Sequence, residues 1–245
     1  MKKRLVIALL PLALAVTTLG IGGTTAQSQV PLQSPVNVTP GAVDISHSQP
    51  PLNVHYGYSD LELKYIQKDA ASPAGCTTRN VEETEEAAVV PNSGYVTLAG
   101  VRYDLAQFHF HTPSEHRLNG HADPLEMHLV HKSAAGRILV IGVPLRIGAA
   151  STVDTVLASL SPECGTPVDI SHINLNTLLP ANHSTVRYLG SLTTAPYTEG
   201  VQWFLMTEKT VTQATVDRFK SVFVHGNARV TQPLNGRRLT AVPQN

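Results

Sequence analysis

The chain has 245 residues, of which 42% are hydrophobic and 15% are charged, and its 18 Lys and Arg balance 18 Asp and Glu. This length fits one large domain better than two small ones. The even charge balance gives no sign of a nucleic-acid partner or of a basic membrane-binding face, and the sequence holds no repeat, heptad or low-complexity block.

The first residues have the order of a secretory signal. Three basic residues at 2–4 precede an apolar run from Leu5 to about Leu19, and small residues follow up to Ala26. The apolar run is shorter than the ~20 residues that span a bilayer, and no Cys follows it as a lipoprotein anchor would require. We therefore expect residues 1–26 to be a cleaved signal peptide. The remaining chain would be exported to the periplasm or the medium, without stable membrane insertion.

Short strands are expected between Leu32 and Val90. The runs at 51–57 and 60–66 alternate apolar and polar residues, as half-buried strands do. The segment 76–86, with four glutamates near its end, breaks this alternation. We expect it to form a solvated acidic loop or edge.

The next 60 residues contain a hairpin and a central strand. Ala99 and Gly100 separate two strand-like runs, 94–98 and 101–111, in the pattern of a two-residue hairpin. The run 137–148 is almost wholly apolar, which is typical of a strand buried on both faces.

Two short helices are expected after that strand. Ser151–Asp154 begins one with a pattern like a capping box, and Thr210–Gln213 begins the other. In the second helix the residues near a 3.6-residue period, which should pack on the sheet, are Ala214, Phe219, Val222 and Phe223. The fold class is thus mostly β with a few short helices, in a single domain.

Two cysteines remain in the exported chain, Cys76 and Cys164. An even pair in an exported protein favours a disulfide over two free thiols. Zinc ligation is the alternative, but no other candidate ligand lies near either cysteine in the sequence.

Six of the eleven histidines lie between residues 107 and 131. His109 and His111 are separated by one residue, so on a strand both imidazoles share a face. An antiparallel partner strand can place His128 across from them. Three histidines with an open fourth position are typical of a catalytic zinc site, although imidazole also suits cobalt, copper and nickel. The alternative is a set of ordinary core or surface histidines.

Two polar residues strengthen the metal interpretation. Gln107 precedes His109 by two residues, and Glu126 precedes His128 by two residues, so each shares a strand face with a histidine. Such partners bind the far nitrogen of a ligating imidazole and fix its tautomer.

The run QFHFHTPSEHRLNGHADPLEMHLVH at 107–131 resembles the signature of the α-class carbonic anhydrases. Further similar blocks follow in matching order from about Leu32: QSPVNV at 33–38, SLTTAP at 191–196, EGVQW at 199–203 and NARVTQPLNGR at 227–237. The resemblance implies a catalytic domain over residues 27–245, built on a large twisted mixed sheet of about ten strands. One Zn2+ ion would lie at the base of a funnel, and zinc-bound hydroxide would attack carbon dioxide to give bicarbonate and a proton.

The resemblance also implies roles for individual residues. Thr193 would accept a hydrogen bond from the hydroxide and donate its own to Glu115, so that only a protonated zinc ligand fits. Thr194 would hold bicarbonate, and the backbone carbonyl of Asn227 would orient His111. The apolar wall for carbon dioxide would consist of Val130, Val140, Leu192, Val201 and Trp203. His116 and His131 would be buried structural residues.

Three departures from the family limit these expectations. The block QSPVNV follows the signal almost at once, so a longer aromatic N-terminal stretch is missing. The family's proton-shuttle histidine has no counterpart in NVEETEEAAVV at 80–90, where Thr84 or Glu86 lies nearest, so the shuttle is unknown and hydration should depend on buffer. Tyr197 and Thr198 stand where the family often has a bridging cysteine, so a disulfide here would differ from the family's.

Two alternatives remain open at this point. One is a catalytically weak or silent binding domain of the same fold, which the three retained histidines oppose. The other is a zinc esterase. The sequence also leaves the oligomeric state open, a homodimer included.

Overall fold

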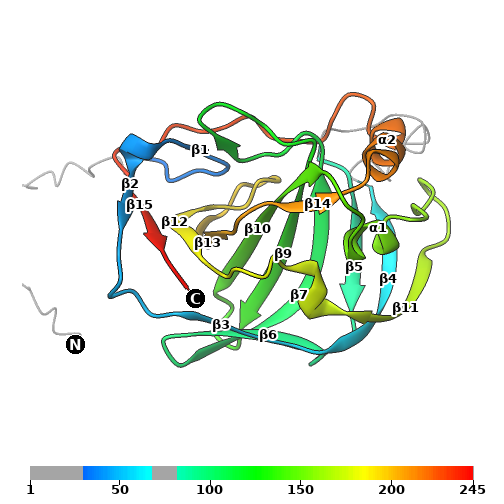
Figure 1. The fold of residues 1–245 in the computed structure, drawn as a ribbon, viewed down its shortest axis with the longest axis horizontal. Coiled ribbons are helices and arrows are strands. Elements are labelled where there is room, and N and C mark those ends of the chain that lie inside the picture. Colours follow the sequence, from blue (N-terminus) through cyan, green and yellow to red (C-terminus); the bar gives the residue numbers. More distant parts are fainter. Residues whose placement is uncertain (1–29, 68–81, 245) are drawn as a thin grey trace, which may run out of the picture. The chain divides into compact units, whose positions relative to one another are not determined.

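The computed structural model describes residues 30–67 and 82–244. Within these ranges a mixed sheet of thirteen strands is accompanied by two short α-helices and a separate pair of strands (Figure 1). The predicted signal segment 1–26 and Cys76 lie outside the described residues, so both remain predictions. Among the residues described, no helix is both long and apolar enough to cross a bilayer.

The elements follow one another along the chain as short strands with few helices. In order the strands are β1 (Asn37–Val38), β2 (Val43–Ile45), β3 (Leu52–Tyr56), β4 (Tyr58–Ile66), β5 (Thr84–Val89), β6 (Gly94–Leu98), β7 (Val101–His111), β8 (Arg117–Leu118), β9 (Leu125–Ser133), β10 (Ile138–Ile147), β11 (Val168–Asn174), β12 (Thr185–Ser191), β13 (Glu199–Leu205), β14 (Lys209–Val211) and β15 (Leu239–Val242). The helices are α1 (Thr152–Val156) and α2 (Gln213–Val222), with 3-10 turns η1 (Pro40–Ala42) and η2 (Leu175–Leu178).

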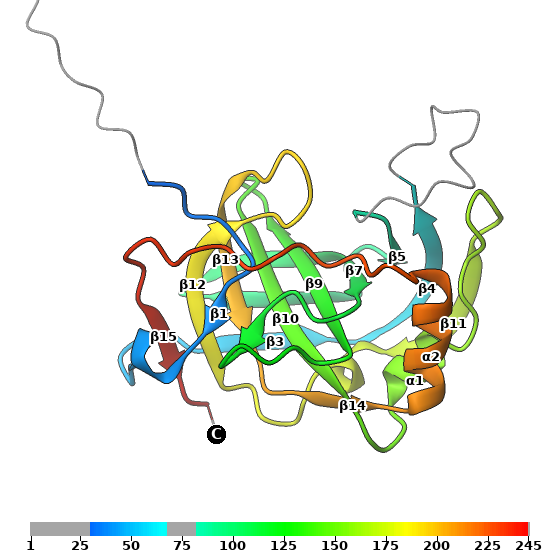
Figure 2. The same cartoon turned by 90° about the horizontal axis from the view of Figure 1, so that it is seen from above.

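Ten strands form the main path of the sheet, in the order β11-β4-β5-β7-β9-β10-β13-β12-β15-β2. Most neighbours are antiparallel, but β10 pairs with β13 and with β14 in parallel, as β15 does with β2. The sheet twists strongly along this path, with α1 and α2 beside β4 and β11 at one side and β15 at the other (Figures 1 and 2). The predicted fold class and the sheet of about ten strands are therefore confirmed.

A β-bulge in β7 decides which side chains face the core. Leu105 pairs with His131 of β9, but the register shifts before Gln107, which pairs with Val130. Before the bulge the odd-numbered Tyr103 and Leu105 are buried in the main core, whereas after it the even-numbered Phe108 and Phe110 are buried there. His109 and His111 therefore point to the opposite face of the sheet.

Two of the predicted strand features are confirmed. Ala99 and Gly100 have φ angles of 48° and 77° and join β6 to β7, with Leu98 paired to Val101. Positive φ at both central residues matches the right-handed twist of a hairpin. The apolar run 137–148 forms β10, which lies at the centre of the sheet and is buried over most of its length.

The first predicted helix is confirmed and the second is displaced. Ser151 caps α1, and its side chain and that of Asp154 form a reciprocal capping box. By contrast, residues 209–211 pair with β10 as strand β14, so α2 begins later, with Thr212 as its N-cap.

The buried face of α2 also differs in part from the prediction. Its buried residues are Thr215, Val216 and Phe219, and Phe223 is buried just beyond its end. Ala214 is exposed instead. Ala214 precedes the buried Phe219 by five residues, which places it about 140° away around the helix and on the outer side.

The prediction of a solvated acidic segment is wrong for the part that the structure describes. Residues 84–89 form β5 inside the sheet, between β4 and β7, and Glu83 and Glu85 are fully buried. Glu83 accepts a hydrogen bond of 2.7 Å from the hydroxyl of Tyr65. Burial raises the pKa of Glu85 from 4.5 to about 7. Pairing with two neighbouring strands thus overrides the polar composition.

Replacing Glu85 by Gln should stabilise the protein at high pH only. The folded-state pKa is raised, so wild-type stability falls as the pH rises from about 4.5 to about 7, while a neutral Gln has no such dependence. We expect Glu85→Gln to raise the free energy of unfolding by roughly 1–3 kcal/mol at pH 8 and by little at pH 5, measured by urea denaturation. The exposed Glu208→Gln is the control. An equal effect at both pH values would contradict this account.

Candidate metal centre

The pairing of β7 with β9 brings the three predicted ligand histidines together. His109 of β7 lies directly opposite His128 of β9, and His111 is two residues further along β7. Ligand-capable nitrogens of the three rings lie within 4.8 Å of one another, and the ring centroids are 4.6 to 5.3 Å apart. One divalent cation can therefore contact all three.

Each of these rings is held by an acceptor on its other nitrogen. Gln107 Oε1 lies 2.9 Å from His109 Nδ1, the backbone oxygen of Asn227 lies 3.1 Å from His111 Nδ1, and Glu126 Oε1 lies 2.8 Å from His128 Nε2. These oxygens only accept, so the ring nitrogens that face them carry the protons. The lone pairs left for a metal are on Nε2 of His109 and His111 and on Nδ1 of His128.

The side chains fit a zinc ion with an open coordination position. His111 Nε2 is buried and has no hydrogen-bond partner, which is costly unless a ligand occupies it. Burial lowers the pKa of His111 to about 4 and also lowers that of His128, so both rings are neutral and able to coordinate at pH 7. Imidazole ligands, unlike thiolates, leave the positive charge of the ion uncancelled.

A second cluster of potential ligands is a hydrogen-bond network rather than a metal site. His116 uses both ring nitrogens, one at 2.7 Å from Glu126 Oε1 and the other at 2.6 Å from the hydroxyl of Tyr188. Burial alone would raise the pKa of Glu126, but its electrostatic interactions and hydrogen bonds with His116 and His128 hold that pKa well below the ordinary value. The ionised Glu126 therefore accepts from both histidines.

Gly142 makes room for this carboxylate. It pairs with His128, and a Cβ atom built on it would lie 2.8 Å from a methyl carbon of Leu205 and 3.1 Å from Glu126 Oε1. A side chain at this position would require the Leu205 methyl group to shift and would crowd the Glu126 carboxylate.

His131 lies on the other face of the sheet. Its ring is fully buried, with Nε2 at 2.6 Å from the hydroxyl of Tyr56 and Nδ1 at 3.3 Å from the oxygen of Leu139. The structure thus places both His116 and His131 as buried histidines, as expected, although His116 shares Glu126 with a ligand.

Glu115 lies beside two of the ligand histidines, His111 and His128, and Thr193 lies beside Glu115. Glu115 and Thr193 are both buried, and Glu115 Oε1 accepts a 2.8 Å hydrogen bond from the backbone of Arg229. Burial raises the pKa of Glu115 to about 7, while His128, the Arg229 amide and the Thr193 side chain act to lower it. Glu115 Oε2 is buried without a hydrogen-bond partner and lies 3.9 Å from His128 Nδ1.

The residues expected to form the apolar wall gather in one cluster, separate from the main core. Val140 pairs with Val130 on one side and with Trp203 on the other. The Trp203 ring lies 4.8 Å from that of His128. The cluster also includes Val201 and, as a partly buried member, Leu192. Thr194 is half-buried and lines a small cavity together with Thr193.

The two nearest candidates for proton transfer differ in what their side chains contact. The Thr84 hydroxyl is buried and donates to the oxygen of Phe110. Glu86 pairs with His109 across β5 and β7 and so shares its face. Cys164 lies in the loop between α1 and β11, and its bond to Cys76 remains a prediction.

Several residues that hold the site were not predicted from the sequence. Tyr188 donates a hydrogen bond of 2.9 Å to Ser34 and contacts His116. Glu82 and Arg229 contact Tyr197 and the loop of Thr193. Ser34 and Arg229 belong to blocks that resemble the family, which is a signal that could have found them. No motif marks Tyr197 or Glu82 as a site residue.

A mixed sheet that presents three imidazoles beside an apolar wall is typical of an enzyme with a single metal ion. The family model described as eukaryotic-type carbonic anhydrase matches residues 23–243. A carbonic anhydrase of Klebsiella pneumoniae is 34% identical over 84% of this chain and 78% of its own length. The chain belongs to this family, the α-carbonic anhydrases.

Solved structures agree with this membership. The Photobacterium profundum α-carbonic anhydrase superposes with a TM-score of 0.73 at 32% identity, covering 87% of this chain and 90% of that one. An α-carbonic anhydrase from Thermovibrio ammonificans, solved with the inhibitor sulfanilamide, has a TM-score of 0.74 at 31% identity, covering 85% and 86%.

Proposed function

We propose that the protein catalyses the reversible hydration of carbon dioxide to bicarbonate and a proton, with one zinc ion held by His109, His111 and His128. The observation that carries this proposal is the convergence of three imidazoles beside an apolar wall, each ring fixed through its other nitrogen. A relative that spans most of the chain and bears the name carbonic anhydrase supports the same activity.

The protein would contribute by binding and orienting the reactants and by excluding water from them. Zinc, when bound, lowers the pKa of a coordinated water to about 7 and so supplies a nucleophile at neutral pH. Val130, Val140 and Trp203 offer a carbon dioxide molecule an apolar surface directly beside His128. Leu192 and Val201 extend that surface, and Thr194 would hold the oxygens of bicarbonate.

Thr193 would act as a filter for the protonated form of the nucleophile. Glu115 Oε1 accepts a hydrogen bond from the Arg229 amide, so the buried Oε2 would accept the hydrogen bond from the Thr193 hydroxyl. A threonine that donates to Glu115 can only accept at its lone pair. It would thus select a partner that carries a proton and aim that partner's own lone pair at carbon dioxide.

We also propose that residues 1–26 direct export and that Cys76 bonds to Cys164 in the mature chain. The basic and apolar order of the leader and the even cysteine count support this. Intact mass of the exported protein, with and without reduction, tests both. A mass that includes residues 1–26 would refute the predicted cleavage. A mass that alkylation raises equally with and without prior reduction would refute the disulfide.

Replacing His111 by Ala should abolish activity while the fold persists. The variant loses one of three ligands from a strand whose core-facing neighbours are unchanged. We expect at least about a 100-fold loss of carbon dioxide hydration in stopped-flow assays, with zinc content reduced and the circular dichroism spectrum retained. The control is His55→Ala, which replaces an exposed histidine away from the three ligands. Hydration undiminished in zinc-depleted His111→Ala would contradict the proposal.

Turnover should depend strongly on added buffer. No histidine stands at either shuttle position, and an ordinary carboxylate with a pKa near 4.3 is a poor relay for a proton leaving at pH 7. We expect kcat to rise severalfold with increasing imidazole concentration, while kcat/KM stays constant. High turnover that is insensitive to imidazole would show that this chain has an efficient relay.

Ester hydrolysis measured in parallel separates a carbonic anhydrase from an esterase or from a silent binding domain.

A further inference from the structure

The loop between β12 and β13, which carries Thr193 and Thr194, adopts a conformation that needs support. Within it the Tyr197 amide donates to the oxygen of Thr194 at 2.8 Å. Tyr197 has a φ of 58°, in the left-handed region that bulky residues rarely occupy. Such a backbone persists only where surrounding contacts hold it.

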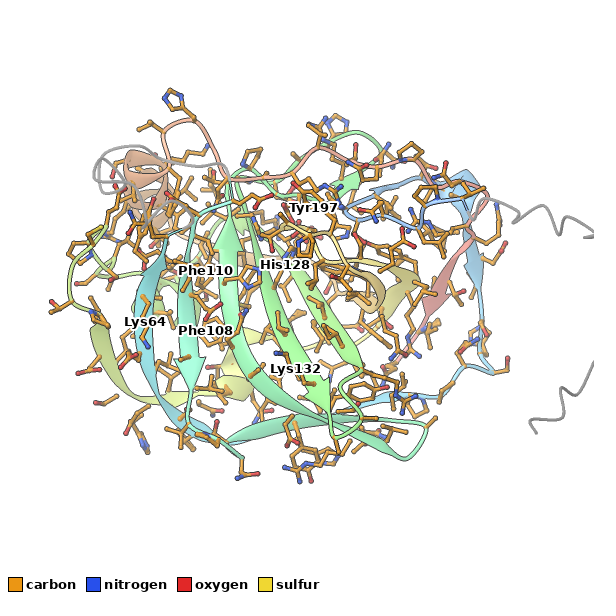
Figure 3. All side chains as sticks on the ribbon, turned by 180° about the vertical axis from the view of Figure 1, so that it is seen from behind. Lys64, Phe108, Phe110, His128, Lys132 and Tyr197 are labelled. Atoms are coloured by element: carbon orange, nitrogen blue, oxygen red, sulfur yellow. The ribbon has the colours of Figure 1, made fainter. Side chains whose placement is uncertain are left out.

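The first of these contacts joins two segments whose strands lie on either side of the strands that carry the ligand histidines. The hydroxyl of Tyr197 donates to Glu82 Oε1 at 2.6 Å, and the amide of Ala195 donates to the same oxygen at 3.2 Å. Glu82 lies just before β5, whereas Tyr197 lies just before β13. The strands of the ligand histidines, β7 and β9, lie between these two in the sheet. Tyr197 and His128 lie toward the same end of the central strands (Figure 3).

The second contact fixes the tyrosine ring. The guanidinium carbon of Arg229 lies 3.7 Å from the ring centroid of Tyr197. The same guanidinium donates to Gln33 Oε1 at 3.0 Å and to the oxygen of Ser34 at 2.6 Å. The backbone amide of Arg229 binds Glu115. One residue thus links the ring of Tyr197 to the carboxylate expected to orient Thr193.

We propose that the Tyr197–Glu82 hydrogen bond is a positioning contact that holds Thr193 and Thr194 at the metal centre. The residues around this contact enclose a small cavity, lined by Glu82, Thr193, Thr194, Tyr197, Asn227 and Arg229. Tyr197 and Glu82 are positioning residues, because they act through the loop. This inference rests on the proposed function and adds two residues to it that the sequence did not mark.

The variant Tyr197→Phe tests the contact with the least disturbance. It removes the hydroxyl but keeps the ring that stacks on Arg229. We expect kcat/KM for carbon dioxide hydration to fall about 3- to 10-fold, as the loss of one hydrogen bond allows, and sulfanilamide to bind more weakly by a similar factor. Zinc content and Tm should match the wild type. Tyr58→Phe, which alters an exposed tyrosine stacked on His172, is the matched control.

Variants of Glu82 separate positioning from general support of the fold. Glu82→Gln retains an acceptor oxygen for both donors and should keep most of the wild-type kcat/KM. Glu82→Ala removes the acceptor and should reproduce the loss seen in Tyr197→Phe. If the two residues act through one bond, the double variant Tyr197→Phe/Glu82→Ala should be little worse than the poorer single variant.

The outcomes are distinct. The positioning role would be overturned if the wild type hydrates carbon dioxide and Tyr197→Phe has the same kcat/KM and the same sulfanilamide affinity. Fully additive losses in the double variant would do the same. Absence of hydration in the zinc-loaded wild type would overturn the proposed function itself, and the role of the contact with it.

Discussion

The register of β7 against β9 is the constraint on which the metal centre depends. A single extra residue before Gln107 shifts the pairing, so that His109 falls opposite His128. Without this bulge the alternation set by Leu105 would turn residues 107, 109 and 111 toward the main core. The same shift sends Phe108 and Phe110 into the core and keeps the imidazoles out of it. Core packing and ligand placement are thus two consequences of one irregularity.

Acceptors then convert three nearby rings into a defined donor set. An amide oxygen, a backbone carbonyl and a carboxylate each hold one histidine, which fixes both its orientation and the nitrogen that it can offer to a metal. Glu126 also binds His116, which reaches Tyr188 and through it Ser34 near the front of the described chain. The site is therefore tied to a residue near the start of the described range.

Much of this arrangement could be predicted from local patterns. His109 and His111 share a face because strands alternate, and Gln107 and Glu126 follow from the same rule. The capping box at Ser151 and the hairpin at Ala99 are also local, because their partners lie within a few residues. These features need no knowledge of the tertiary fold.

The features that could not be predicted from the sequence share a physical cause. The burial of Glu83 and Glu85 depends on two strands distant in sequence, and composition alone cannot reveal it. Strand pairing with β10 likewise took residues 209–211 from the expected helix. The bond between Tyr197 and Glu82 joins residues 115 positions apart, and neither belongs to a motif. Contacts of this kind become visible only when the sheet is assembled.

The most direct test of the account is a crystal structure of the zinc-loaded protein with anomalous data collected on both sides of the zinc edge. We predict one zinc per chain, bonded at about 2.0–2.1 Å to Nε2 of His109, Nε2 of His111 and Nδ1 of His128, with a fourth position open to solvent. Zinc bound through other nitrogens, or at a site without these three residues, would contradict the account.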